Sequence, residues 1–106
     1  MSILAFAMYK PKPGKEQELN TLLVDHLPTL ERLGFKTSTP AFVVQSTDGT
    51  IIEIFEWVSE ETKRAAHVHP DVKRIWEPMD ALCTYPAMKD LPEAQKPFPE
   101  FRVYKS

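Results

Sequence analysis

Two segments in the middle of the chain, residues 41–46 and 50–57, are rich in Val, Ile and aromatic residues. Residues of this kind favour β-strands. Between the segments stands Asp48-Gly49, a pair that can supply the two positive φ angles of a tight two-residue turn. The sequence therefore predicts an antiparallel hairpin with a strongly apolar surface. A hairpin of this kind has to pack against other elements to be stable in water.

The N-terminal third of the chain predicts a strand followed by a long helix. Residues 2–9 are apolar at both alternating sets of positions, which is typical of a central strand that is covered on both faces. A proline- and glycine-containing segment ends this strand. Residues 15–33 then carry leucines at helical spacing, and Gly34 supplies a C-terminal stop. This pattern predicts an amphipathic helix.

The second half of the chain predicts two helices, an irregular arm and a final strand. Ser59 suits the N-cap of a short helix that ends near His67. Pro70 suits the first position of the next helix, which presents an apolar stripe. Residues 91–99 are rich in proline and charge and predict an ordered but irregular arm. Residues 100–104 predict a short edge strand, because nearby prolines cannot donate to a ladder.

This order of elements predicts one α+β domain over residues 1–106. Short connections and right-handed crossovers place it most simply in a ferredoxin-like βαββαβ fold, with a four-stranded antiparallel sheet and helices on one face. The other face of such a sheet would be apolar and exposed to water. We therefore expect a second copy to cover it, which makes the chain a homodimer.

Charge and composition exclude several classes of protein. The chain has 13 basic and 15 acidic residues, a net charge of -2 and no block of like charge, so nucleic acid is not an expected partner. The apolar run of residues 3–8 is too short for a membrane span and lacks the basic segment of a signal peptide. We therefore expect no membrane partner and a cytoplasmic protein. Cys83 is the only cysteine, which excludes an internal disulfide.

Residues 53–76, reading EIFEWVSEETKRAAHVHPDVKRIW, resemble the dimeric α/β-barrel superfamily, and in particular its antibiotic-biosynthesis-monooxygenase-like proteins. The resemblance implies two ferredoxin-like sheets packed face to face and a pocket between the helices and the sheet of each subunit. The superfamily includes cofactor-free oxygenases, isomerases and haem-degrading enzymes. The first strand lacks the Asn, and the last helix the His, that the haem-degrading members use. Haem degradation is therefore not expected. The sequence also has no G-x-G-x-x-G motif and no P-loop, so we expect no cofactor.

Three residues are candidates for acid/base chemistry: Glu56, His67 and His69. Glu53 and Glu56 are three apart on one strand, so they face opposite sides and only one can line a pocket. We favour Glu56, because it lies nearer the strand end and the histidines. A carboxylate among apolar neighbours is a common general base. The alternatives are salt bridges for Glu56, helix capping for the histidines, and a metal site built on the His67-Val68-His69 pair.

Four further residues are candidates for substrate binding: Tyr9, His26, Trp57 and Trp76. Aromatic side chains with few polar groups are typical of pockets for planar ligands. The alternative for each of them is a place in the hydrophobic core. These residues favour an enzyme that acts on a small apolar or aromatic molecule, as a cofactor-independent monooxygenase or an isomerase. The second hypothesis is a non-catalytic ligand-binding or accessory domain with the same pocket.

Overall fold

The computed structural model of the chain describes residues 1–104, and its central strand is β3, Ile51–Trp57. Strand β3 pairs with β1 on one side and with β2 on the other, in an antiparallel sheet of order β4-β1-β3-β2-β5. The other four strands are β1 (Ile3–Pro11), β2 (Phe42–Gln45), β4 (Cys83–Thr84) and β5 (Arg102–Val103). The α+β class that the sequence predicts is confirmed.

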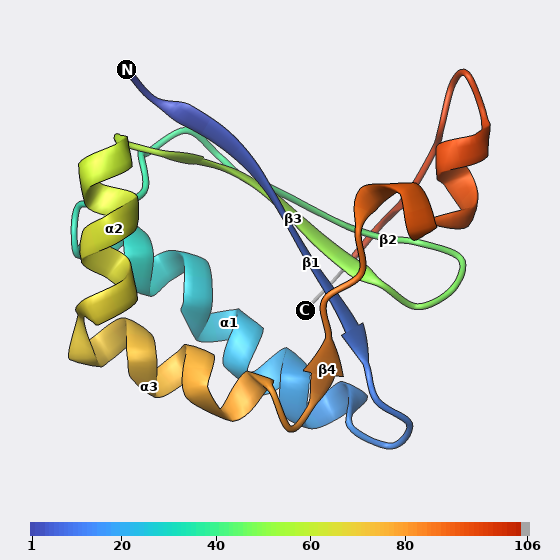
Figure 1. Cartoon of the computed structure of the whole chain (residues 1–106), viewed down its shortest axis with the longest axis horizontal. Coiled ribbons are helices and arrows are strands. Elements are labelled where there is room, and N and C mark those ends of the chain that lie inside the picture. The colour runs from blue at the N-terminus through green and yellow to red at the C-terminus, as the bar shows by residue number, and fades with distance from the viewer. Residues whose placement is uncertain (105–106) are drawn as a thin grey trace.

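Three α-helices cover one face of this sheet (Figure 1). They are α1 (Glu16–Arg32), α2 (Glu60–Val68) and α3 (Pro70–Met79). Ser59 caps α2, since its side chain accepts a hydrogen bond from the N–H of Thr62, and Pro70 opens α3. These helices lie close to their predicted positions because their caps and apolar stripes are local features of the sequence.

The final strands differ from the prediction. The sequence predicts a four-stranded sheet that ends with residues 100–104, whereas the structure has five strands. Strand β4 pairs with β1 at one edge, and β5 pairs with β2 at the opposite edge. Strand β4 has only two residues, too few to leave an alternating pattern in the sequence. It was therefore missed, and the strand predicted to complete the sheet lies at its other edge.

The hairpin turn also differs from the prediction. Within residues 1–104 only glycines have a positive φ, and Gly49 has a φ of 94° while Asp48 does not enter that region. The N–H of Ser46 bonds to the carbonyl of Thr50, at 2.8 Å, and the N–H of Gly49 bonds back to the carbonyl of Ser46, at 3.0 Å. The connection is thus a three-residue loop, in which Gly49 alone needs the left-handed conformation, rather than a two-residue turn.

A C-terminal arm, residues 85–101, lies on the sheet face that the helices leave open (Figure 1). It contains two short 3₁₀ helices, Met88–Asp90 and Pro92–Gln95. Glu93 fastens it to the hairpin, because its carboxylate accepts the hydroxyl of Ser46 at 2.7 Å and the N–H of Thr47 at 2.9 Å. In residues 1–104, no helix has the length and apolar character needed to cross a bilayer.

Candidate functional site

Glu53 is a carboxylate in the middle of the sheet, with its side chain on the helix-covered face and only 1% of the residue exposed. Neighbouring positions of β3 on this face hold Ile51 and Phe55, which are buried as well. Strand alternation therefore puts Glu53 in the interior. A buried carboxylate is costly unless hydrogen bonds replace its water. Glu53 has two of these bonds, and both are donated to the same oxygen, Oε1.

Tyr9 donates the first of these bonds, from its hydroxyl to Glu53 Oε1 at 2.9 Å. In the register of β1 and β3, Ala7 lies opposite Glu53, so Tyr9 is its diagonal neighbour on the same face. Burial first, and then the charge of Glu53, raise the pKa of Tyr9 well above its ordinary value. Tyr9 therefore keeps its proton and acts as a permanent hydrogen-bond donor to the carboxylate.

His26 donates the second bond, with its Nδ1 2.9 Å from Glu53 Oε1. It lies on the buried stripe of α1 and is only 2% exposed. On the far side of its ring, Nε2 is 2.8 Å from Nε1 of Trp76, on α3. An indole N–H can only donate, so Nε2 has to accept. The proton of the imidazole is therefore on Nδ1, where it faces Glu53.

These four side chains form one buried chain of hydrogen bonds, which we call the Glu53 network: Tyr9, Glu53, His26 and Trp76. It joins β1, β3, α1 and α3. Tyr9 at one end and Trp76 at the other end both donate a hydrogen bond into the network. The positions of the protons between them are fixed as a result. Within residues 1–104 no Lys or Arg pairs with Glu53, so the negative charge is balanced by hydrogen bonds alone.

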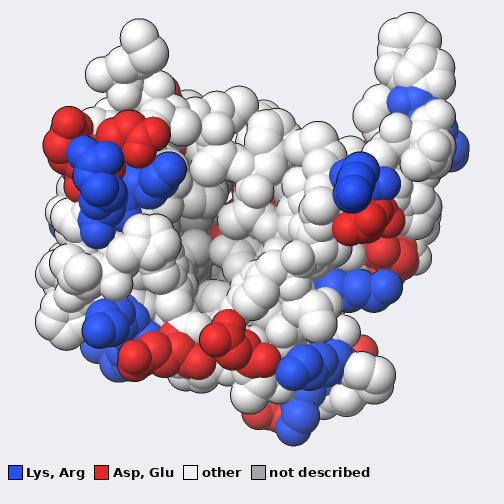
Figure 2. Space-filling model, viewed as in Figure 1, with Lys and Arg blue, Asp and Glu red and all other residues white. Residues whose placement is uncertain are grey.

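Two hollows reach this network. The first, here called the inner cavity, has a volume of about 210 Å³ and reaches Glu53. The second is a groove of about 380 Å³ that reaches Tyr9 and Trp76 from the side of α3. Besides Glu53, the inner cavity is lined by Leu23, Val24, Leu27, Pro28, Val43 and Tyr104. The space-filling view in Figure 2 shows that the surface is hollowed between the helices and the sheet, with charged side chains near the edge of the hollow.

Glu56, the carboxylate that the sequence analysis favours for the pocket, lies on the opposite face of the sheet from Glu53. Its carboxylate accepts the hydroxyl of Thr37 at 2.8 Å. Hydrogen bonds from Ser2 and then Thr37 lower the pKa of Glu56. The structure therefore puts Glu53, rather than Glu56, beside the helices. Strand alternation is the reason, since residues three apart on a strand face opposite sides.

The two histidines near α2 do not lie together with a carboxylate. His67 is exposed, and its ring lies edge-on to Trp76 with the centroids 4.9 Å apart. His69 is the N-cap of α3, where its Nδ1 accepts the N–H of Asp71 at 3.1 Å. Its ring packs against Phe35. No cluster of three His, Cys, Asp or Glu side chains that suits a metal ion occurs in residues 1–104.

The predicted substrate-binding residues divide into two groups. Tyr9, His26 and Trp76 come together in the Glu53 network. Trp57 lies apart from it, because it is 6% exposed and packs against Phe55 in the core, with ring centroids 5.1 Å apart. The prediction that Glu56 rather than Glu53 faces the helices differs from the structure, in which Glu53 faces them. The parity of Glu53 on the strand, shared with Ile51 and Phe55, makes it a candidate, but Glu56 likewise shares its parity with apolar residues, so no signal in the sequence separates the two.

Comparison of the chain with models of known families, with curated proteins and with solved structures found no match.

Proposed function

We propose that this chain is a small-molecule enzyme in which Glu53 removes a proton from a ligand in the inner cavity. The observation that carries this proposal is the arrangement around the carboxylate. Both hydrogen bonds to Glu53 end on Oε1, and Glu53 also lines the cavity. Oε2 is therefore the oxygen that remains for a ligand. A buried carboxylate with one committed and one open oxygen suits a general base.

The rest of the Glu53 network positions this base. His26 and Tyr9 hold Oε1, and Trp76 keeps the proton of His26 on the side of Glu53. Removal of a proton from an activated C–H bond would leave a carbanion on the ligand. Return of the proton to another carbon completes an isomerisation, and reaction of the carbanion with O₂ begins a cofactor-independent oxygenation. Proton removal is the step that both reactions share.

Deuterium exchange tests this step without knowledge of the full reaction. The protein is incubated in D₂O with a panel of small apolar and aromatic compounds that carry an activated C–H bond, and incorporation is measured by NMR. We expect exchange with the natural chain and a loss of about 10²- to 10⁴-fold in Glu53→Gln, as is typical when a general base is removed. Glu56→Gln is the matched control on the same strand and should exchange normally. Equal exchange by all three proteins would contradict the proposal.

A second function has support from the same site. Oε1 of Glu53, both ring nitrogens of His26, the Tyr9 hydroxyl and the Trp76 N–H already have partners inside the chain. A network in which all of these groups are already paired also suits a non-catalytic ligand-binding or accessory domain. In that case compounds would raise the melting temperature of the protein but would undergo no deuterium exchange.

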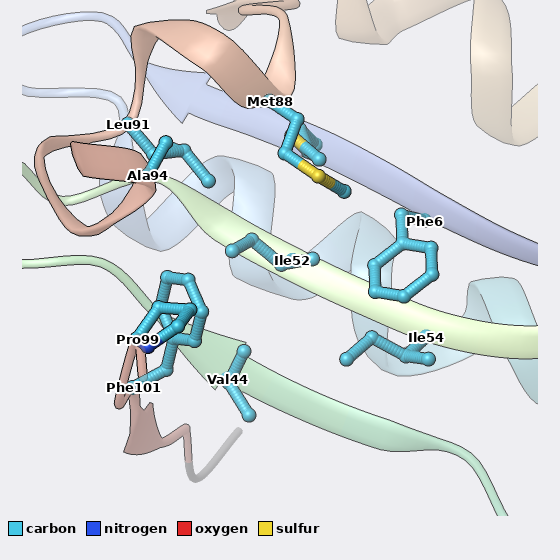
Figure 3. A pocket seen from close by; sticks show the side chains of 10 residues that line it. Phe6, Val44, Ile52, Ile54, Met88, Leu91, Ala94, Pro99 and Phe101 are labelled. Carbon is cyan, nitrogen blue, oxygen red and sulfur yellow. The ribbon is translucent and has the colours of Figure 1, made fainter. Parts of the chain in front are cut away.

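We also propose that the chain has the ferredoxin-like arrangement of the dimeric α/β-barrel superfamily and forms a homodimer. The strand order β4-β1-β3-β2 within the sheet supports the first part. The second part rests on the sheet face opposite the helices, where Leu4 is 62%, Phe6 46% and Phe42 69% exposed. The arm covers one end of this face, where an apolar trough separates its side chains from those of Ile52 and Ile54 (Figure 3). Exposed apolar surface of this extent favours association.

Analytical ultracentrifugation tests the homodimer. Phe6→Lys should shift the protein to monomer, because a charge at the centre of an apolar interface is not solvated. Val68→Lys, on the exposed surface of α2, is the control and should leave the mass unchanged. A natural chain that sediments as a monomer at micromolar concentration would contradict the homodimer. We also place the protein in the cytoplasm, which its single free cysteine, Cys83, supports.

A further inference from the structure

The inner cavity combines apolar walls with the carboxylate of Glu53, whose Oε2 accepts no hydrogen bond within residues 1–104. Residues of α1 and β2 line it together with Tyr104. The hydroxyl of Tyr104 bonds to Asn20 at 2.8 Å, so it is already occupied. The hydrogen bonds to Glu53 both reach Oε1. Oε2, on a residue that is 99% buried, is therefore the polar atom that a ligand in the cavity would meet.

The protons of the network decide what this oxygen can do. Tyr9 and His26 both donate to Oε1, and Trp76 fixes the His26 proton in place. No proton of the network is left for Oε2, and a carboxylate oxygen only accepts. A ligand must therefore bring a donor. It cannot bring a carboxylate, because a second negative charge beside Glu53 would be repelled in a site with no Lys or Arg in its lining.

The number of donors is limited as well. An ammonium group has three N–H bonds to satisfy, and one open oxygen can match only one of them while the apolar walls match none. A single O–H or N–H group is fully matched. A molecule with several hydroxyl groups would leave the others buried without partners. The site thus suits a neutral ligand with one donor.

The size of the cavity limits the rest of the ligand. A cavity of about 150 Å³ lined by apolar side chains is enough to hold benzene. The inner cavity, at about 210 Å³, has room for one ring and a small substituent or for a fused pair of small rings.

We infer that the inner cavity binds a small neutral apolar molecule with a single hydrogen-bond donor, of the size of phenol or indole, and that this donor bonds to Glu53 Oε2. This inference rests on the site of the proposed function and adds the class of ligand to it. The specificity comes from the fixed direction of the Glu53 carboxylate, which Tyr9, His26 and Trp76 together maintain.

A set of nearly isosteric probes tests the ligand class. The four probes share one aromatic ring. Phenol donates a hydrogen bond, toluene neither donates nor accepts one, benzonitrile only accepts, and benzoate carries a negative charge. Binding is measured by titration of the ¹H–¹⁵N spectrum of the protein. We expect phenol to bind at least about tenfold more tightly than toluene, as a hydrogen bond to a charged acceptor implies. Benzonitrile and benzoate should not bind detectably.

The Glu53→Gln variant should reverse this preference. The amide oxygen has to accept from Tyr9 and His26, so the NH₂ group takes the position of Oε2 and can only donate. We expect the variant to lose its preference for phenol and to bind benzonitrile more tightly than toluene. Glu56→Gln should behave like the natural chain. Equal affinity of phenol and toluene for the natural chain, or an unchanged preference in Glu53→Gln, would overturn the inference.

A second variant tests the location without altering the network. Val24 lines the cavity from α1 and is 48% exposed, so Val24→Phe can fill part of the space from the surface. We expect it to abolish phenol binding. Phenol binding that survives Val24→Phe would place the ligand elsewhere and overturn the inference, even if Glu53→Gln does not fold.

The outcomes separate this inference from the proposed function. Deuterium exchange that depends on Glu53, without a preference for phenol over toluene, would leave the enzyme in place and remove this ligand class. A preference for phenol without any exchange would support the ligand class and identify a binding protein.

Discussion

Trp76 and His26 lie fifty residues apart in the chain and are joined by a hydrogen bond of 2.8 Å between Nε1 of the indole and Nε2 of the imidazole. This contact links α3 to α1. It also determines the tautomer of His26, because the indole N–H has no lone pair to offer in return. The effect reaches Glu53, which receives the remaining proton of the ring as a hydrogen bond. One side chain at the end of the network thus orients the carboxylate in the middle.

Trp76→Phe should release the His26 tautomer. Without the indole donor, Nε2 no longer has to accept, and the proton can occupy either ring nitrogen. Imidazole ¹⁵N chemical shifts should show a proton on Nδ1 alone in the natural chain and a mixture of tautomers in the variant. We also expect a loss of about 1–3 kcal/mol in the free energy of unfolding, since a buried acceptor is left without its partner. An unchanged tautomer would show that Trp76 does not control it.

Tyr9→Phe should make the free energy of unfolding fall less steeply as the pH rises in the alkaline range. Burial and the charge of Glu53 raise the pKa of Tyr9 in the folded protein, whereas the unfolded chain ionises near pH 10. Above that pH the unfolded state binds fewer protons than the folded state. The contribution of Tyr9 is therefore fully present below about pH 10 and falls by up to ~1.4 kcal/mol per pH unit above it.

Urea denaturation between pH 8 and pH 11.5 measures this slope. The pKa values of Tyr85 and Tyr104 are also raised, chiefly by burial, so a smaller slope should remain in Tyr9→Phe. At neutral pH the variant should be about 1.5–3 kcal/mol less stable, because a hydrogen bond to a charged group is lost. Identical alkaline slopes in the two proteins would refute this assignment to Tyr9.

Glu93→Ala should release the C-terminal arm from the hairpin. Glu93 is 4% exposed and connects the arm to Ser46 and Thr47, so its removal leaves these donors without an acceptor. We expect trypsin to cleave after Lys89 several times faster in the variant, while the rest of the domain stays folded. Cleavage at the natural rate would mean that other contacts hold the arm. Glu100→Ala, an exposed position of the same arm, is the control.

The same contact should weaken in acid. Burial raises the pKa of Glu93, but the hydrogen bonds from Thr47 and Ser46 outweigh it, and the pKa is lowered overall. A carboxylate of this kind stabilises the folded state above its ordinary pKa of 4.5 and loses that effect as the pH falls through the lower, folded value. The protection of the arm amides against hydrogen exchange, corrected for the pH dependence of the intrinsic rate, should therefore fall below pH 4.5 in the natural chain. In Glu93→Ala this pH dependence should be absent.

Gly49→Ala should destabilise the hairpin through backbone strain alone. The φ of Gly49 is 94°, and a Cβ added there would meet no atom within 4 Å. We expect the free energy of unfolding to fall by about 1 kcal/mol and the melting temperature by roughly 4–8 °C. Thr47→Ala, in the same loop with a negative φ, is the control and should change the stability less. Equal stability of Gly49→Ala and the natural chain would show that the loop adapts without cost.

Local patterns were enough to predict most of the elements. The leucine spacing of α1, the cap at Ser59 and the proline that opens α3 each depend on residues within a few positions of one another. The hairpin was predicted for the same reason, although its loop has one residue more than expected. Strand β4 was missed because two residues carry no periodic pattern.

The site depended on distant parts of the chain. Glu53 and Glu56 both stand among apolar neighbours on β3, so the sequence alone determined that one of them would be buried but not which one. The packing of α1 and α3 against one face of the sheet made that choice, and it brought His26 and Trp76 to Glu53. Alternation along a strand is a local property, whereas the face that becomes the interior is decided only when the helices dock.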